Sequence, residues 1–168
     1  MRRALLLALL ASSCAGLALA DGAGDPAPAT SNAGEYYDKD GNPTYKIGAD
    51  GTVDWYTFIG YRMYGANCLQ CHGPDALGSS YAPSLVDSLK SLNTQQVQST
   101  IINGKRDVTS SQELVMPSFG ENKNVMCYLD PIYVYLRARS DGALSRERPV
   151  KHEPKPDGWE KTVDSCFG

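Results

Sequence analysis

Five consecutive residues, Cys68-Leu69-Gln70-Cys71-His72, constrain this chain of 168 residues more than any other feature. Two cysteines separated by two residues, with a histidine directly after the second, suit four kinds of chemistry. These are a structural zinc site, a redox-active dithiol, a disulfide and the covalent attachment of a haem. Each makes different demands on the rest of the chain, so the remaining sequence decides among them.

Zinc and a redox dithiol are disfavoured by what surrounds the motif. A structural zinc site needs four ligands, usually from a second cysteine pair or from two histidines. Here Cys127 and Cys166 lie 39 residues apart, and the second histidine, His152, lies in a polar tail. A thioredoxin-like dithiol requires a strand-to-helix junction within a βαβ unit. The pattern of this chain indicates mostly helices and loops instead.

The pattern C-x-x-C-H is typical of covalent haem attachment. Two thioether bonds must reach two vinyl groups on one edge of a flat macrocycle, while the next side chain lies beneath the iron. The spacing therefore predicts that Cys68 and Cys71 anchor the haem and that His72 is the proximal iron ligand. The expected cofactor is one covalently attached haem c.

Residues 1–20 predict export as a signal peptide. A basic start precedes an apolar run over residues 4–11, and a small-x-small cleavage site ends at Ala20. The apolar run is far shorter than the ~20 residues of a bilayer span. Lipid modification of Cys14 is disfavoured because Ala11 stands where that site usually has leucine. We therefore expect a periplasmic protein with no stable membrane insertion.

Cleavage after Ala20 would leave 14 basic and 19 acidic side chains, a formal charge of −5. This balance argues against nucleic acid as a partner, because phosphate binding draws on clustered lysine and arginine. It suggests that charge steers the association with protein partners. We divide the remainder into a flexible leader of small and polar residues (21–34) and one domain with a polar C-terminal tail (35–168).

Three helices are predicted from apolar spacing and from capping signals. The first covers residues 54–66 and leads directly to Cys68. The second covers residues 94–103, with an N-terminal capping box and a glycine after its end. The third begins with Asp130 as its cap and Pro131 at its first position. We expect residues 143–168 to cross the surface without regular structure.

Turn signals at residues 40–41 and 50–51 predict a small hairpin before the first helix. The acidic residues Asp38 and Asp40 also suggest a calcium-binding loop. Pro43 excludes this reading, because it stands where such a loop needs glycine, and no glutamate follows at the closing position.

Four side chains are candidates for the second axial ligand: Met63, Met116, Met126 and His152. Met116 is favoured because it lies in the run LVMPSFG, which can form a loop over a haem face. The other two methionines suit core packing, and the histidine suits a solvated tail. His/Met ligation fills both axial positions, so such a site exchanges electrons without binding a substrate. The prediction is an electron carrier and not an enzyme.

Beyond the haem motif, the chain resembles class I cytochromes c. The shared features are glycine and aromatic positions on the first helix, an aromatic–leucine pair on the last helix, a proline loop after the motif, and a glycine followed by a methionine–proline pair: Gly60, Tyr64, Tyr135, Leu136, Gly78, Ala82–Leu85, Gly104, Met116 and Pro117. The resemblance implies a mainly α fold, with three or more helices around one covalently attached haem, long loops and an extended C-terminal tail. It also implies that the carbonyl of Pro83 accepts a hydrogen bond from His72 and fixes the orientation of this ring.

Residues 35–168 resemble more narrowly the four-cysteine cytochromes c associated with methanol metabolism in methylotrophic bacteria. The features in common are the VDW segment, the NVMCY run and the late cysteine. This resemblance implies a monomeric carrier that accepts electrons from a quinoprotein (pyrroloquinoline-quinone) methanol or alcohol dehydrogenase. A downstream cytochrome or a terminal oxidase would be the acceptor.

The two remaining cysteines fit this picture. With two thiols bonded to haem, an exported protein would oxidise Cys127 and Cys166 to a disulfide that holds the tail against the third helix. The alternative is two buried free thiols.

Two other functions remain open from the sequence. One is a haem protein with an open iron site, acting as a small-molecule sensor or redox enzyme. The other is a permanent cytochrome subunit of a dehydrogenase.

Overall fold

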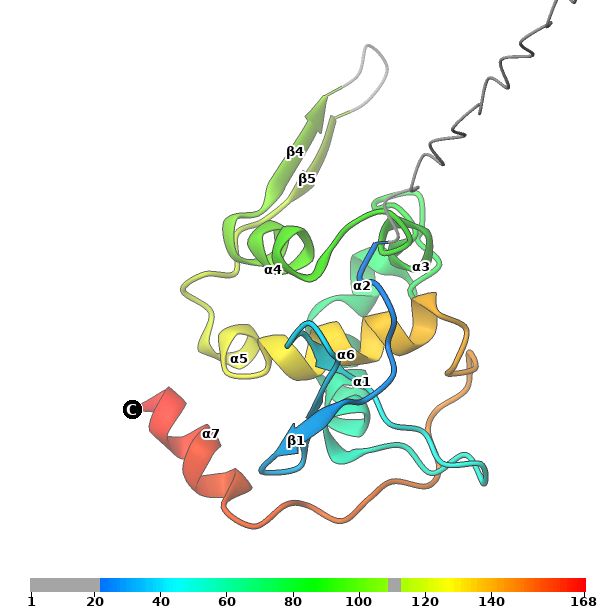
Figure 1. Ribbon diagram of the computed structural model, residues 1–168. Coiled ribbons are helices and arrows are strands. Elements are labelled where there is room, and N and C mark those ends of the chain that lie inside the picture. Colours follow the sequence, from blue (N-terminus) through cyan, green and yellow to red (C-terminus); the bar gives the residue numbers. More distant parts are fainter. Residues whose placement is uncertain (1–21, 109–112) are drawn as a thin grey trace, which may run out of the picture.

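The computed structural model describes residues 22–108 and 113–168 (Figure 1). The predicted signal peptide therefore lies outside the described residues. Mainly helical as expected, the described chain also contains five short strands. Its elements are β1 (Thr30–Asn32), β2 (Glu35–Tyr37), β3 (Pro43–Thr44), α1 (Trp55–Asn67), α2 (Leu69–His72), α3 (Leu85–Ser88), α4 (Thr94–Asn103), β4 (Lys105–Val108), β5 (Glu113–Met116), α5 (Lys123–Met126), α6 (Leu129–Ser140) and α7 (Trp159–Phe167).

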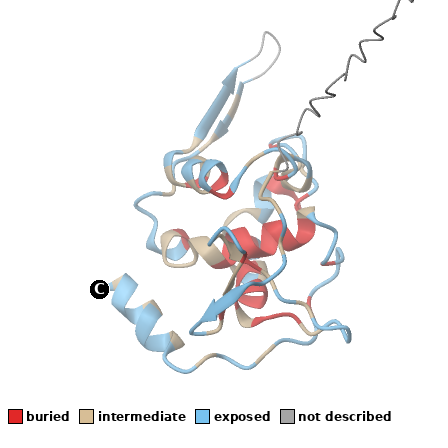
Figure 2. Cartoon of the chain, in the orientation of Figure 1, coloured by how far each residue is buried: buried red, intermediate tan, exposed pale blue. Residues whose placement is uncertain are grey.

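Helices α1 and α6 cross at the centre of the molecule (Figure 1), and α3 and α4 pack on α6. The close approach of α1 to α6 depends on Gly60. A Cβ atom at this position would lie 1.8 Å from the carbonyl oxygen of Pro131 and 2.8 Å from the Cβ of Tyr135. Buried residues concentrate in these two helices (Figure 2). The glycine and the aromatic residue that suggested the family are thus partners in one helix crossing.

Helix α4 begins at its predicted cap, and α1 begins at Trp55, one residue after its predicted start. The carboxylate of Asp54 accepts the N–H of Thr57 at 2.8 Å and caps α1. At the start of α4, Asn93 and Gln96 form a reciprocal capping box. Both caps are local signals, since each joins residues three positions apart.

The predicted cap of α6 is wrong. The helix begins at Leu129, and its preceding residue, Tyr128, makes no capping hydrogen bond through its side chain. Asp130 instead accepts a 2.6 Å hydrogen bond from the side-chain amide of Gln98 on α4. The carboxylate that the local sequence predicts as a helix cap therefore binds a side chain on another helix.

Residues 22–34 are not the flexible leader that their composition predicts. They contain β1, which pairs antiparallel with β2, and the N–H of Gly22 donates to Lys90. The guanidinium of Arg137 on α6 donates to the carbonyl oxygens of Ala23 at 2.9 Å and of Asp25 at 3.3 Å. The segment has few side chains to bury, but its backbone carbonyls provide the acceptors that this buried cation needs.

The predicted small hairpin is present as β2 and β3, joined by a turn in which Gly41 has a φ of 80°. Its acidic residue is engaged in the fold, because Asp38 is buried and lies 2.9 Å from the guanidinium of Arg137. Burial alone would raise the pKa of Asp38. Hydrogen bonds from Asn42 and from Arg137 outweigh this effect and hold the pKa below its ordinary value.

Three features of residues 105–168 were not predicted from the sequence or differ from the prediction. Strands β4 and β5 form an antiparallel hairpin that projects from the body of the molecule (Figure 1). The tail ends in a helix, α7, where no regular structure was expected. The ring of Trp159, at the start of α7, packs edge-on against Trp55 and Tyr56 of α1. These aromatic contacts give the tail the apolar partners that its composition does not reveal.

A disulfide joins Cys127 to Cys166 and so holds α7 near the start of α6, as predicted. In the described part of the chain, no helix is long and apolar enough to cross a membrane.

Candidate haem site

Helix α2 carries the cysteines and the histidine of the motif. Cys68 ends α1 by donating its N–H to Tyr64, and it is also the residue from which α2 begins. Its thiol is half-buried, whereas that of Cys71 is exposed, and neither forms a disulfide. Burial, and to a smaller extent the neighbouring Cys71, raise the pKa of the Cys68 thiol to about 11. Helix α1 thus places both thiols on one short turn.

The proximal-ligand candidate is already oriented by the fold. His72 is buried, and its Nδ1 lies 3.1 Å from the carbonyl oxygen of Pro83, the contact that the resemblance implies. A carbonyl can only accept, so this contact places the ring proton on Nδ1. In the neutral ring, Nε2 is then the nitrogen without a proton, which can bind a metal.

The loop after His72 has a constrained backbone. Gly73 and Gly78 have positive φ values, and so does Ala76, at 63°, although it carries a Cβ. Such a conformation costs on the order of 1 kcal/mol and persists where the surroundings enforce it. The carbonyl of Ala76 accepts the N–H groups of Leu85 and Val86. The loop is therefore held at its far end by the residues that follow Pro83.

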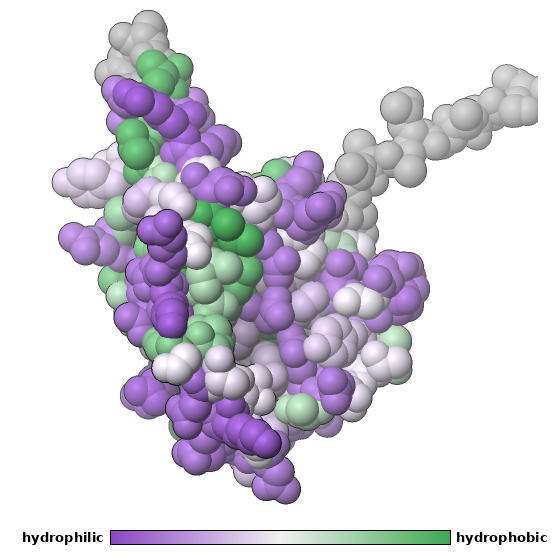
Figure 3. Space-filling model, turned by 90° about the vertical axis from the view of Figure 1, so that its left-hand side faces the viewer, coloured by the Kyte–Doolittle hydropathy of each residue, from purple (hydrophilic) through white to green (hydrophobic). Residues whose placement is uncertain are grey.

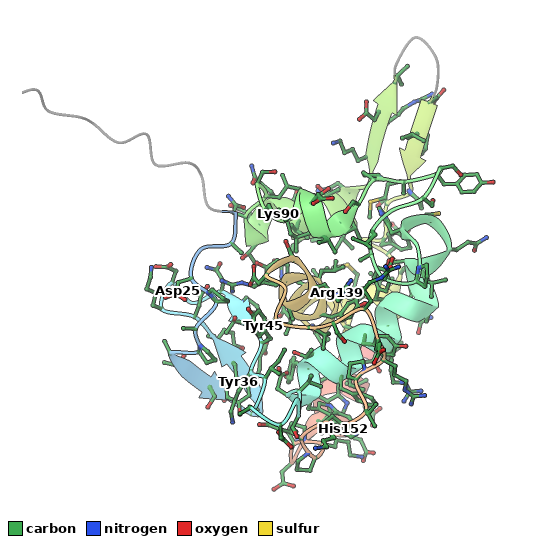
Figure 4. All side chains as sticks on the ribbon, turned by 90° about the vertical axis from the view of Figure 1, so that its right-hand side faces the viewer. Asp25, Tyr36, Tyr45, Lys90, Arg139 and His152 are labelled. Atoms are coloured by element: carbon green, nitrogen blue, oxygen red, sulfur yellow. A yellow bond between two sulfur atoms is a disulfide. The ribbon has the colours of Figure 1, made fainter. Side chains whose placement is uncertain are left out.

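Two side chains from the central helices hold the near end of this loop. The hydroxyl of Tyr64 on α1 donates to the carbonyl of Gly73 at 2.5 Å. Arg139 on α6 donates to the carbonyls of Asp75 at 2.9 Å and of Leu144 at 2.7 Å, and it lies near the centre of the molecule in Figure 4. The α1–α6 crossing thereby fixes the backbone that follows the histidine.

The acidic group of this loop is neutralised within the protein. The carboxylate of Asp75 lies 2.5 Å from the guanidinium of Arg146. Burial would raise the pKa of Asp75, but the N–H of Leu77 and the charge of Arg146 outweigh burial and lower it. The sequence pattern did not indicate these roles of Arg139 and of the Tyr64 hydroxyl. Their acceptors are backbone carbonyls, which leave no mark in the sequence.

Met116, the distal-ligand candidate, lies on a different element, at the end of β5. Its side chain is half-buried against the core. Gly104 has a φ of 74° and lets the backbone at the end of α4 lie close to the backbone of Met116. A Cβ at Gly104 would lie 2.6 Å from the carbonyl oxygen of Met116. The following residues are fastened to the end of α4 by the bond from Phe119 N–H to Ile101 O, at 3.1 Å. Met116 thus lies on a strand and not on the loop that was predicted.

The other candidate ligands lie at three different places in the fold. Met63 is half-buried against the core, and Met126 is half-buried on α5. His152 stacks on the ring of Phe58 with a centroid distance of 3.9 Å and lies edge-on to Trp55. The tail histidine therefore rests on α1 and does not extend freely into solvent.

These residues fit a haem better than a bare metal ion. Among the described residues, no group of three or more histidine, cysteine or acidic side chains could hold a metal. The structure offers instead one imidazole with a committed Nδ1 and two free thiols on the same turn. Apolar side chains gather below the β4–β5 hairpin (Figure 3), as a macrocycle with apolar faces requires.

Comparisons with known proteins agree with this geometry. The family "Cytochrome C oxidase, cbb3-type, subunit III" matches residues 59–136. Cytochrome c-553I of Paracoccus denitrificans is 48% identical over 134 residues, which are 80% of this chain and 59% of that protein. Cytochrome c-555 of Methylococcus capsulatus is 34% identical over 93 residues, which are 55% of this chain and 69% of that protein.

The fold agrees as well. The crystal structure of the c-type cytochrome XoxG from Methylobacterium extorquens AM1 superposes with a TM-score of 0.78 at 48% identity, covering 84% of this chain and 86% of that one. The chain therefore belongs to the cytochromes c, electron-transfer proteins that carry a covalently bound haem c.

Proposed function

We propose that this cytochrome is a periplasmic carrier that accepts electrons from a quinoprotein (pyrroloquinoline-quinone) methanol or alcohol dehydrogenase. It would pass them towards the respiratory chain through a downstream cytochrome or a terminal oxidase. The proposal is supported by the resemblance of residues 35–168 to cytochromes of methanol metabolism, and by the 48% identity to XoxG over most of both chains. The chain spans 59% of the length of cytochrome c-553I, so that protein supports the type of domain more than the partners.

Within this proposal, Cys68 and Cys71 would hold the haem through thioether bonds, and His72 would bind its iron through Nε2. The observation that carries the assignment is the 3.1 Å contact of His72 Nδ1 with Pro83, which prepares the ring as a ligand. Met116 would be the second side chain to hold the iron. Haem c, when bound, provides one-electron exchange at its iron.

Ligation on both sides explains why the protein would be a carrier and not an enzyme. If His72 and Met116 both bind, no axial position is left for oxygen, peroxide or an organic substrate. What the protein then contributes is the geometry of its ligands. The bonds from Tyr64 and Arg139 hold the loop after His72, and so the backbone that positions this ligand.

The periplasmic assignment depends on the signal peptide predicted at residues 1–20. The disulfide between Cys127 and Cys166 supports it, because such bonds persist in oxidising compartments and are rare in the cytosol. We also propose that the mature protein is a monomer and meets its partners transiently.

The test is reduction of the purified holoprotein by a quinoprotein methanol dehydrogenase in the presence of methanol. We expect complete reduction, followed by the haem absorbance, and no uptake of carbon monoxide by the ferrous protein. A cytochrome that ascorbate reduces but the dehydrogenase does not would refute the proposed partner. Ready binding of carbon monoxide would refute the closed coordination and favour a sensor or an enzyme.

A further inference from the structure

Helix α4 carries the segment that contains Met116. The chain passes from the end of α4 into β4, whose first residue, Lys105, pairs with Met116 on β5 (Figure 1). The residues after Met116 return to the last turn of α4. There the carbonyl of Ile102 accepts the N–H of Gly120 at 3.0 Å and the hydroxyl of Ser118 at 2.6 Å. The position of Met116 therefore follows the position of α4.

Two polar contacts between side chains hold α4 against α6. The hydroxyls of Thr94 on α4 and Tyr133 on α6 lie 2.7 Å apart in a buried contact. One turn further along α4, the side-chain amide of Gln98 donates to the carboxylate of Asp130 at 2.6 Å. We call these two contacts, made by Thr94, Gln98, Asp130 and Tyr133, the α4–α6 clamp.

The clamp shares one face of α4 with apolar side chains. Val97 and Ile101 are buried in the core, and they lie three and seven positions after Thr94, on the same side of the helix. Apolar burial is not directional, so it favours contact between the helices without fixing one arrangement. Hydrogen bonds require defined distances and angles. The clamp therefore fixes where α4 lies along α6.

Helix α6 is a common support for both ligand candidates. On the side of His72, Arg139 of α6 donates to the carbonyl of Asp75 in the loop that follows the histidine. On the side of Met116, the clamp joins α6 to the helix that carries the methionine segment. The position of α4 on α6 therefore sets where Met116 lies relative to His72.

We propose that the residues of the α4–α6 clamp are positioning residues, which strengthen the bond between Met116 and the haem iron by fixing α4 on α6. This inference rests on the proposed ligand role of Met116 and adds what holds that side chain in place. Methionine has a flexible side chain, so its backbone must be held if the sulfur is to stay in position. Groups that orient a metal ligand from outside typically change metal affinity by about tenfold or more when they are removed.

The experiment measures the affinity of the oxidised holoprotein for added imidazole, which competes with the methionine sulfur for the iron and changes the haem absorbance. The clamp variants are Thr94→Val and Gln98→Met, which remove a polar group and nearly keep the size of the side chain. Thr94→Ser keeps the hydroxyl. The matched control is Thr57→Val, which removes a buried hydroxyl that donates to Asp54 at 2.6 Å at the start of α1. We expect each clamp variant to bind imidazole about threefold to tenfold more tightly than wild type, and Thr94→Ser and Thr57→Val to stay within about twofold.

Urea unfolding of every variant separates positioning from a general loss of stability. Thr57→Val should unfold more easily than wild type without gaining affinity for imidazole. If the clamp variants bind imidazole no more tightly than wild type, the positioning role is refuted while the assignment of Met116 stands. An equal gain in Thr57→Val would also overturn it, because any loss of stability would then loosen the site. If Met116→Ala keeps the six-coordinate spectrum, the ligand assignment and the clamp both fail, and reduction by the dehydrogenase still tests the carrier role separately.

Discussion

Replacement of Glu35 by glutamine should stabilise the holoprotein at about pH 8 and change its stability little at about pH 4. Glu35 begins β2 and is only 8% exposed. Burial raises the pKa of its carboxyl group to about 7, an effect that the hydrogen bond from Tyr37 opposes and the charge of Asp130 reinforces. The Tyr37 hydroxyl donates to Oε2 at 2.7 Å, and Oε1 has no hydrogen-bond partner among the described residues.

The sign of the effect follows from the two pKa values. In the unfolded chain the group titrates near 4.5. Below this pH the folded and unfolded states both carry the proton, so the group does not change the free energy of unfolding. Between 4.5 and about 7 the unfolded chain releases its proton while the folded protein still holds it, so the free energy of unfolding decreases as the pH rises. The two values differ by about 2.5, which corresponds to at most about 3 kcal/mol above pH 7.

The assay is urea unfolding of wild type, Glu35→Gln and the control Glu121→Gln, whose side chain is exposed, at several pH values. The pKa values of Asp54 and Asp130 are also raised by burial. These groups remain in every variant, so the difference between the curves reports Glu35 together with its coupling to Asp130. We expect the Glu35→Gln and wild-type curves to separate by about 2–3 kcal/mol as the pH rises from about 5 to about 8. Parallel curves would show that the burial of Glu35 carries no energetic cost.

Further predictions concern the ligands and the helix crossing. Met116→Ala should abolish the low-spin, six-coordinate absorption spectrum and lower the potential, whereas Met126→Ala should keep the spectrum; the opposite result would identify Met126 as the ligand. Gly60→Ala should destabilise the protein by about 3 kcal/mol or more in thermal unfolding, because its methyl group would overlap a backbone carbonyl of α6. Arg139→Met should cost about 2–4 kcal/mol, since it leaves two carbonyls without their donor. Arg146→Gln, at a side chain 72% exposed, should cost less than about 1 kcal/mol, and equal losses would argue against the role of Arg139.

Features that depend on residues close together in the chain could be predicted from the sequence. Helix α4 starts at its expected cap, since Asn93 bonds three residues ahead, and α1 starts one residue after its predicted first residue, Asp54. The turn of α2 follows from the spacing of the haem motif itself. The disulfide followed from counting thiols in an exported haem protein, and the structure contains it.

Features that depend on distant partners could not be predicted. The carboxylate of Asp130 is a plausible cap locally, and its bond to Gln98 exists only once α4 lies beside α6. Residues 22–34 look unstructured because they supply carbonyl oxygens and not side chains to the fold. The role of Arg139 was missed for the same reason, since Asp75 offers it a backbone oxygen 64 positions away.

The guanidinium of Arg137 has a consequence for the order of events during biogenesis. It binds carbonyl groups near the start of the chain, at Ala23 and Pro43, across 114 and 94 positions. Loops of this length close slowly, so these contacts of Arg137 cannot form until α6 has been synthesised. Until then, Cys68 and Cys71 belong to an open polypeptide. If these two cysteines bind the haem as proposed, the late closure by Arg137 would leave a period in which both sulfur atoms can be reached.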